Sequence, residues 1–240
     1  MAKKLVGLVD KISHRCYTLY MNLIEKYDYP SLKRSNSSGK RLYNTPSGNL
    51  PSVTTILDRT KDKTFLVEWK KRVGEEEANR ITKEASGLGT IFHKHLENYI
   101  LGEERPNGNN FVYKLAKDMS EVVIEKGLRN VDEIWGSEIS LYYPGLYAGT
   151  TDLVGVHNGT PAIMDYKSTT RPKKEEWVED YYLQCCAYAL AHNELYETNI
   201  NKVVIIMCSR EKQYQEFICE GEKFEDKCQK WTERLEEYYK

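Results

Sequence analysis

The chain has 240 residues, 40% of them hydrophobic and 30% charged, and its formal net charge is -1. This apolar content can form a core and excludes a wholly disordered chain, while near-neutrality excludes a uniformly basic body that binds nucleic acid over its whole surface. The length fits one large domain, or one domain with an extension, better than two domains.

The N-terminal end is basic. Residues 1–45 carry nine basic and three acidic residues, a surplus of +6, so the remaining chain carries -7. We expect residues 1–50 to form a basic segment that packs on or extends the core, and residues 51–240 to form a single domain. The composition of Ser35–Gly39 predicts a loop, and Tyr43–Asn49 predicts a tight turn between short extended pieces.

The other expected elements follow from periodicity, capping residues and turn signals. The predicted helices are Phe65–Glu84, Ile91–Leu101 with its entry at Gly87–Thr90, Val112–Lys126, Lys173–Asn193 and Glu222–Tyr239. The predicted strands are Trp135–Tyr142, Tyr147–Val156, Pro161–Lys167, Lys202–Cys208 and Gln213–Cys219. The order of helix, three strands, helix and strand predicts an α/β fold in which helices flank a central mixed β-sheet.

The cysteines and the apolar runs limit the compartment and the cofactors. The six cysteines are Cys16, Cys185, Cys186, Cys208, Cys219 and Cys228. None forms a CxxC pair, so we expect reduced thiols, with neither zinc nor an iron–sulfur cluster. The longest apolar run, Val203–Cys208, is far shorter than the roughly 20 residues that span a bilayer. With no secretion signal at the N-terminus, these features favour an intracellular protein without a membrane partner.

The most informative segment is a predicted hairpin. Asn158-Gly159 favours a two-residue type I′ turn, which places Asp152 directly opposite Asp165 and leaves Lys167 two residues further along the same face. Carboxylates about 5 Å apart repel by about 3 kcal/mol at an effective dielectric constant of about 20. A bound divalent cation would offset this repulsion, because hard cations take oxygen ligands. The alternative is a surface patch in which Lys167 pairs with one aspartate.

Two predicted helices supply further polar candidates. Gln184 interrupts an apolar and aromatic stripe that includes Tyr188, which makes it a candidate contact of a metal site or of a substrate phosphate. A glutamine satisfied within the core, beside an ordinary core tyrosine, is the alternative. His93 and Glu97 are spaced i, i+4, a metal pattern that gains weight only if their helix lies over the two aspartates.

Five motifs, taken in order, resemble those of the PD-(D/E)XK nuclease superfamily in its RecB-like branch. They are Gly89-Thr90-Ile91-Phe92-His93, Glu138, Gly149-Thr150-Thr151-Asp152, Asp165-Tyr166-Lys167 and Gln184-x-x-x-Tyr188. Within this branch, the closer resemblance is to phage exonucleases and mitochondrial genome maintenance exonucleases. The resemblance runs from about residue 40 to the C-terminus and implies the restriction-endonuclease-like core, α-β-β-β-α-β.

The resemblance implies a Mg²⁺- or Mn²⁺-dependent deoxyribonuclease. The implied metal ligands are His93, Asp152, Asp165 and the backbone carbonyl of Tyr166, with Glu138 close to the site. The implied catalytic residues are Asp152, Asp165, Lys167, Gln184 and Tyr188. A plain two-residue loop at Pro144-Gly145 would turn Glu138 to the wrong sheet face, so we predict a one-residue bulge that places it opposite Asp152.

The expected substrate is DNA with a free end, single-stranded or duplex. The basic N-terminal segment is expected to contact phosphates. The other expected phosphate contacts are Ser52, Thr54, Lys70, Lys71, Arg72, Lys173 and Lys174, with a solvated helix face as the alternative for these lysines and the arginine. The resemblance implies a role in phage or organellar DNA recombination, repair or degradation, in the host cytoplasm if a phage encodes the chain, with a single-strand-annealing or recombination protein as a partner. The rival functions are an endonuclease or resolvase with the same chemistry, a catalytically silent DNA-binding module and, least favoured, a glycosidase.

Overall fold

The structure, a computed structural model, describes residues 23–37 and 39–240. Cys16 and four of the nine basic residues expected in the N-terminal segment lie outside the described residues. In the part that is described, a small antiparallel sheet comes first, with the strands β1 (Lys33–Ser37), β2 (Lys40–Thr45) and β3 (Gly48–Pro51). The expected turn after Tyr43 therefore joins β2 to β3. The expected loop at Ser35–Gly39 is wrong, because its first three residues pair with β2 in a hairpin.

The central sheet has five strands, in the order β4-β5-β6-β7-β8. The strands are β4 (Val131–Tyr143), β5 (Tyr147–His157), β6 (Thr160–Thr169), β7 (Lys202–Ser209) and β8 (Tyr214–Glu220). Only β6 and β7 run parallel, and the other neighbours are antiparallel, so the sheet is mixed as predicted. Every residue of β7 is buried, which agrees with its apolar sequence and its position under helices on both faces.

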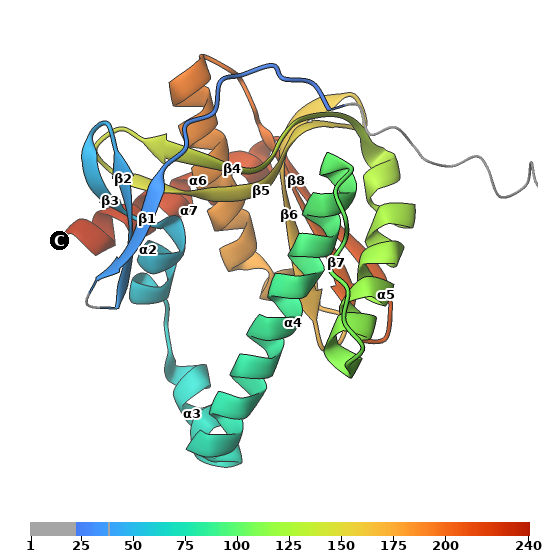
Figure 1. Ribbon diagram of the computed structural model, residues 1–240. Coiled ribbons are helices and arrows are strands. Elements are labelled where there is room, and N and C mark those ends of the chain that lie inside the picture. The colour runs from blue at the N-terminus through green and yellow to red at the C-terminus, as the bar shows by residue number, and fades with distance from the viewer. Residues whose placement is uncertain (1–22, 38) are drawn as a thin grey trace, which may run out of the picture.

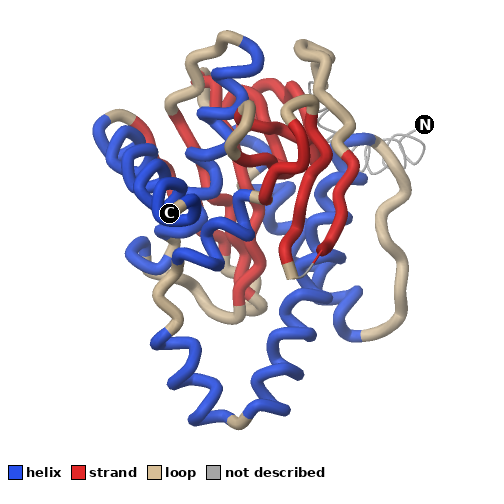
Figure 2. The backbone as a smooth tube through the Cα atoms, turned by 90° about the vertical axis from the view of Figure 1, so that its left-hand side faces the viewer, coloured by secondary structure: helices blue, strands red, loops and turns tan. Residues whose placement is uncertain are grey.

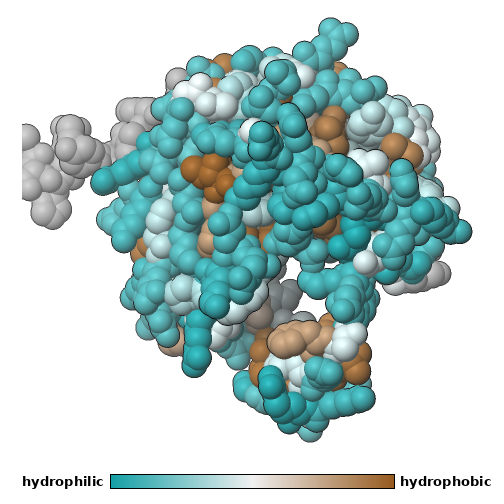
Figure 3. Space-filling view, turned by 180° about the vertical axis from the view of Figure 1, so that it is seen from behind, coloured by the Kyte–Doolittle hydropathy of each residue, from teal (hydrophilic) through white to brown (hydrophobic). Residues whose placement is uncertain are grey.

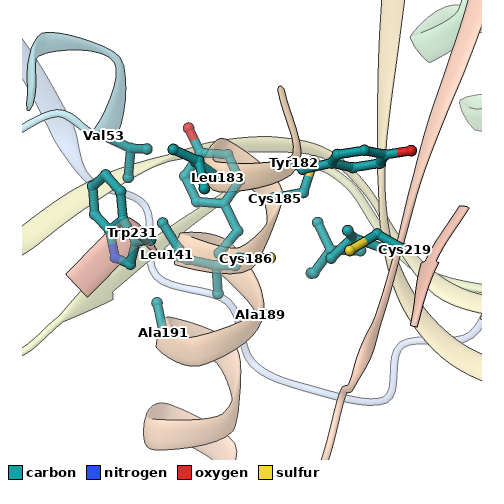
Figure 4. Packing of buried hydrophobic residues seen from close by; sticks show 14 of the residues in the cluster. Val53, Leu141, Tyr182, Leu183, Cys185, Cys186, Ala189, Ala191, Cys219 and Trp231 are labelled. Carbon is teal, nitrogen blue, oxygen red and sulfur yellow. The ribbon is translucent and has the colours of Figure 1, made fainter. Parts of the chain in front are cut away.

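The helices cover both faces of this sheet (Figure 1). They are α2 (Val53–Thr60), α3 (Thr64–Val73), α4 (Glu75–Leu101), α5 (Phe111–Lys126), α6 (Glu179–Tyr196) and α7 (Glu222–Tyr239), with short 3₁₀ turns η2 (Leu128–Asn130) and η3 (Glu175–Trp177). On one face, α4 and α5 pack against strand residues such as Leu153 and Met164. On the other, α2, α6 and α7 enclose the alternate residues Val154 and Ile163. Figure 4 shows this second core around α6.

Two predicted helix boundaries are wrong. The break expected at Gly87–Thr90 lies instead at Gly74, whose φ of 88° ends α3 and lets α4 start in a new direction. The helix expected from Lys173 begins later, with η3 followed by α6, so Lys173 and Lys174 stand before any helix. Both boundaries were misplaced for the same reason. Helical periodicity does not show where a turn interrupts a continuous polar stretch of sequence.

The α3–α4 pair projects from the body of the molecule. Figure 2 shows the two helices as the arms of a V. No residue of α3 is buried, and Phe65, Leu66, Val67 and Ile81 are exposed apolar side chains. Figure 3 shows hydrophobic surface on this projection. Among the described helices, none combines the length and apolar character needed to cross a bilayer.

Candidate active site

The candidate site lies where β5 and β6 separate. The type I′ turn is as predicted, with Asn158 and Gly159 at φ values of 47° and 77°, and the ladder runs from His157–Thr160 to Leu153–Met164. The pairing of β5 with β6 ends at Leu153–Met164, so the next two residues, Asp152 and Asp165, face each other without pairing. The N–H of Tyr166 donates instead to Asp152 Oδ2, at 2.7 Å. The two aspartates therefore stand just beyond the last paired residues, at a fork in the sheet.

Glu138 reaches this fork through the register of β4 and β5. Tyr143 pairs with Tyr147, so the connecting loop has one residue more than the plain two-residue turn, and Gly145 in it has a φ of 75°. Ser137 and Ile139 pair with Leu153 and Thr151, which places Glu138 opposite Asp152. The predicted extra residue and its effect on Glu138 are confirmed. Glu138 itself has a φ of 53°, a left-handed conformation that is unusual for a side chain within a strand.

Three of these side chains converge on one point. His93, Glu138 and Asp152 each offer a ligand atom, and these atoms lie within 4.8 Å of one another. His93 Nδ1 lies 3.3 Å from Asp152 Oδ1 and 3.8 Å from Glu138 Oε1. Carboxylate oxygens and imidazole nitrogens are both donors to divalent cations. The cluster can therefore hold a divalent cation, supplied by α4, β4 and β5.

Asp165 lies beside this cluster in a different environment. It is buried, forms an ion pair with Lys167, and its Oδ1 accepts a hydrogen bond from Gln184 Nε2 at 3.1 Å. The expected contact of Gln184 with the two-aspartate site is thus present. Tyr188, one turn further along α6, is buried against Gly149, where an added Cβ would come within 2.6 Å of its hydroxyl.

The charges at the site shift one another's pKa values. Burial raises the pKa of Asp165 to about 6, although Lys167 opposes the shift. Burial would also raise the pKa of Asp152, but the positive charge of His93 holds it below its usual value. For His93, burial acts to lower the pKa, and the Asp152 carboxylate outweighs it and raises the value to about 10. In the absence of a cation, a proton on His93 compensates Asp152.

A cleft of about 640 Å³ opens over these residues. One wall carries Arg34 and Arg41 from the small sheet, together with Ser52 and Thr54 at the start of α2. The Ser52 hydroxyl caps α2 by accepting from Thr55 N–H at 3.0 Å, and it lies 3.0 Å from Thr54 Oγ1. Sequence reasoning counted the two arginines only as part of a basic segment. The alternation of β1 and β2, which places them on one face of the small sheet, is the signal that identifies them.

The other predicted residues differ in where they lie relative to the cleft. Lys70, Lys71 and Arg72 belong to α3 on the projecting pair and do not line it. Lys173 lies nearby, since the ring of Tyr181 is 5.4 Å from its Nζ and 5.0 Å from Lys167 Nζ. Lys174 faces the Trp177 ring, at 5.6 Å, outside the cleft. Glu97 lines the cleft but pairs with Lys94 at 3.0 Å and is not one of the three converging groups.

The fold and the site define an α/β protein in which two carboxylates and a histidine, able to hold a cation, lie in a partly basic cleft. No protein-family model matches the chain. The chain is 26% identical over 209 residues to mitochondrial genome maintenance exonuclease 1 of Homo sapiens, and 27% identical over 205 residues to that of Mus musculus. Each match covers 79% of this chain and 58% or 59% of the relative, so the chain spans about three fifths of the relatives' length.

The chain is also similar in structure to a solved protein. The crystal structure of a candidate exonuclease from Eubacterium rectale matches 64% of this chain and 64% of its own, with a TM-score of 0.47 and 12% sequence identity.

Proposed function

We propose that the chain is a metal-dependent DNA exonuclease of the PD-(D/E)XK superfamily, in its RecB-like branch. Residues 51–240 would form the nuclease domain, and residues 1–50 a basic extension of it. The observation that carries the proposal is the convergence of His93, Glu138 and Asp152 beside the Asp165–Lys167 ion pair, at the floor of a cleft with arginines on its wall. The similarity to two exonucleases supports the same function.

The residues of the site have separable roles in this proposal. His93, Glu138 and Asp152 would hold Mg²⁺ or Mn²⁺, with Asp165 and the Tyr166 carbonyl as the further ligands that the superfamily resemblance implies. When bound, the cation would supply Lewis acidity toward the scissile phosphate. Lys167 would place its ammonium group beside the developing negative charge and orient the attacking water. Gln184 would hold Asp165 through its amide hydrogen bond, and Tyr188 would line the cleft beside it.

The proposed substrate is DNA with a free end. Arg34 and Arg41, which line the cleft, would bind phosphates next to the cluster of carboxylates and histidine, and Ser52 and Thr54 would bind a terminal phosphate. A cellular role in phage or organellar DNA recombination, repair or degradation, alongside a single-strand-annealing or recombination protein, belongs to the same proposal.

Cleavage of end-labelled DNA tests the proposal directly. We expect Lys167→Ala and Asp165→Asn to lower the cleavage rate in Mg²⁺ at least about a hundredfold, because each removes charge that acts on the phosphate or the cation. Arg129→Ala is the matched control, since this exposed residue on η2 lies outside the cleft and should leave the rate unchanged. Wild-type rates in either active-site variant would refute the assignment.

The form of the DNA separates the proposed exonuclease from its rivals. A linear strand should be degraded and a covalently closed circular strand should resist, since an exonuclease requires an end. Rapid cleavage of closed circles would favour the endonuclease or resolvase. Tight DNA binding without cleavage in Mg²⁺ or Mn²⁺ would favour the silent binding module.

A further inference from the structure

A continuous series of clefts leads away from the candidate active site along α2. The active-site cleft shares Arg41 and Thr54 with a neighbouring cleft of about 280 Å³. That cleft in turn shares Arg59 with a third, of about 610 Å³, which is bordered by Lys40 and by Tyr238 and Tyr239 of the C-terminal helix. Residues of α2 border all three clefts. We call this series the α2 track.

The α2 track carries positive charge at intervals. Arg34, Lys40, Arg41 and Arg59 border it, and none of the four forms an ion pair with a carboxylate of the described residues. Four carboxylates line its first cleft, Glu97, Glu138, Asp152 and Asp165, and beyond that cleft two more border it, Glu237 and Asp58, of which Asp58 pairs with Lys63 at 2.9 Å. The basic side chains therefore remain available to an anionic ligand, and they are spaced along a path rather than gathered at one point. Such spacing fits a polyanion with regularly repeated phosphates.

The path of the track distinguishes a single strand from a duplex. Arg41 and Tyr43 lie on the face of the small sheet that borders the active-site cleft, whereas Lys40 and Leu42 lie on the opposite face, beside the third cleft. The track therefore bends around the small sheet within the length of α2, about 12 Å for eight residues. Duplex DNA has a persistence length of about 150 base pairs and does not follow such a bend cheaply. Single-stranded DNA is flexible enough to follow this bend at little cost.

The far end of the track offers aromatic rings. Tyr239 is 51% exposed and Tyr238 is half-buried, with ring centroids 5.2 Å apart in an edge-to-face arrangement. The Tyr239 hydroxyl donates to the carbonyl of Leu146, which positions this ring at the mouth of the third cleft. Aromatic rings in a basic groove are the usual surface for unpaired bases.

We propose that the α2 track binds single-stranded DNA that extends from the active site, with its phosphates on Arg41, Arg59 and Lys40 and a base against Tyr238 or Tyr239. This inference rests on the proposed function, because it takes DNA as the occupant of the first cleft. It adds the surface that grips the strand beyond the reacting phosphate, and it assigns Tyr238, Tyr239, Lys40 and Arg59 to substrate binding.

The test is a binding measurement without cleavage. Fluorescence anisotropy in EDTA compares the full-length wild type with Lys40→Glu/Arg59→Glu, on oligonucleotides of roughly 6 and roughly 20 nucleotides. Only the longer strand can fill both the first cleft and the rest of the track. We expect the double variant to bind the long oligonucleotide about tenfold more weakly and to lower the slope of log K against log salt by about 1.4, as for two lost single-strand phosphate contacts. Binding of the short oligonucleotide should change less than about twofold.

The matched control is Lys126→Glu/Arg129→Glu, which changes the net charge equally at exposed residues outside the track. Lys40→Gln/Arg59→Gln removes the same two contacts without adding negative charge, so about the same loss in slope is expected with a smaller loss in affinity. Equal losses on both oligonucleotides, equal losses in both Glu variants, or no loss would overturn the proposal.

The outcomes separate this proposal from the proposed function. If the wild type binds the long strand through Lys40 and Arg59 but does not cut it in Mg²⁺, the track stands and the exonuclease assignment fails. If the wild type cuts end-labelled DNA while the Lys40 and Arg59 variants bind like wild type, the track alone fails.

Discussion

Glu138 shows at the level of one residue how the site is assembled. Its φ of 53° costs about 1–2 kcal/mol for a side chain with a Cβ. The pairs on either side, Ser137 with Leu153 and Ile139 with Thr151, are kept, so the strained residue is held in place by an otherwise regular ladder. Strain of this kind is maintained where the surroundings determine the conformation, and here it accompanies a carboxylate within 4 Å of His93.

Replacing Glu138 separates the strain from the carboxylate. In metal-free buffer, Glu138→Gly should be about 1 kcal/mol more stable than Glu138→Ala, because glycine adopts positive φ without a penalty. Urea denaturation measures the difference. At Ser140, which has ordinary strand geometry, the order should reverse, with Ala more stable than Gly. Equal stabilities at position 138 would show that its backbone relaxes.

At the level of elements, the close approach of β4 to β5 depends on a glycine. A Cβ on Gly155 would lie 2.0 Å from the carbonyl oxygen of Glu133, a backbone atom that no side-chain rotation can move. The register of β4 also shifts beside it, between Ile134 and Gly136. By contrast, exposed Gly87 in the middle of α4 has open space around its Cα. The two glycines therefore predict opposite responses to the same substitution.

Gly155→Ala should destabilise the protein by about 3 kcal/mol or prevent folding, because the strand must move to accommodate the methyl group. Gly87→Ala should stabilise it by about 1 kcal/mol, the difference in helix propensity. Urea or thermal denaturation in EDTA compares both with wild type. A small effect at Gly155 would mean that β4 is free to shift away from β5.

At the level of the whole molecule, the near-zero net charge conceals two regions of opposite character. Basic residues of the small sheet and α2 border the cleft and the α2 track, while carboxylates gather at the fork of the central sheet. The acidic centre carries a proton on His93 in the absence of a cation, since its pKa is about 10. A cation that binds His93 must displace this proton, because only the neutral imidazole coordinates.

Cation binding should therefore release about one proton at neutral pH, and the apparent affinity should rise about tenfold per unit between about pH 7 and pH 9. The sign follows from the raised pKa of His93: as pH rises, fewer protons compete with the cation. Burial raises the pKa of Asp165 to about 6, so below that pH the Asp165 carboxylate is also protonated. This second proton competes with the cation as well.

Titration calorimetry of Mn²⁺ in buffers of different ionisation enthalpy measures this release. His93→Gln should abolish the release. His95→Gln is the control. Burial lowers the pKa of His95 to about 4, so this imidazole is already neutral at pH 7 and releases no proton when the cation binds. A binding enthalpy that does not depend on the buffer would contradict His93 as a ligand.

The sequence by itself determined the parts of this protein that depend on neighbours along the chain. Asn158-Gly159 set the hairpin register, and helical spacing marked Gln184 as a candidate contact of the site that contains Asp165. The extra residue near Gly145 was expected only because the superfamily resemblance requires Glu138 beside Asp152. The order of elements was sufficient for a mixed sheet covered on both faces. Turn chemistry and periodicity are short-range properties, so a single sequence contains them.

Only the tertiary structure decided how distant segments meet. His93 joins Asp152 because α4 packs on the sheet beside the fork, and Arg34 and Arg41 border the cleft because the small sheet docks on β5. The same packing leaves Lys70–Arg72, which were expected to contact phosphates, on the projecting helices and outside the cleft. These positions depend on which surfaces bury the most apolar area together, and periodicity within one element does not specify its partner.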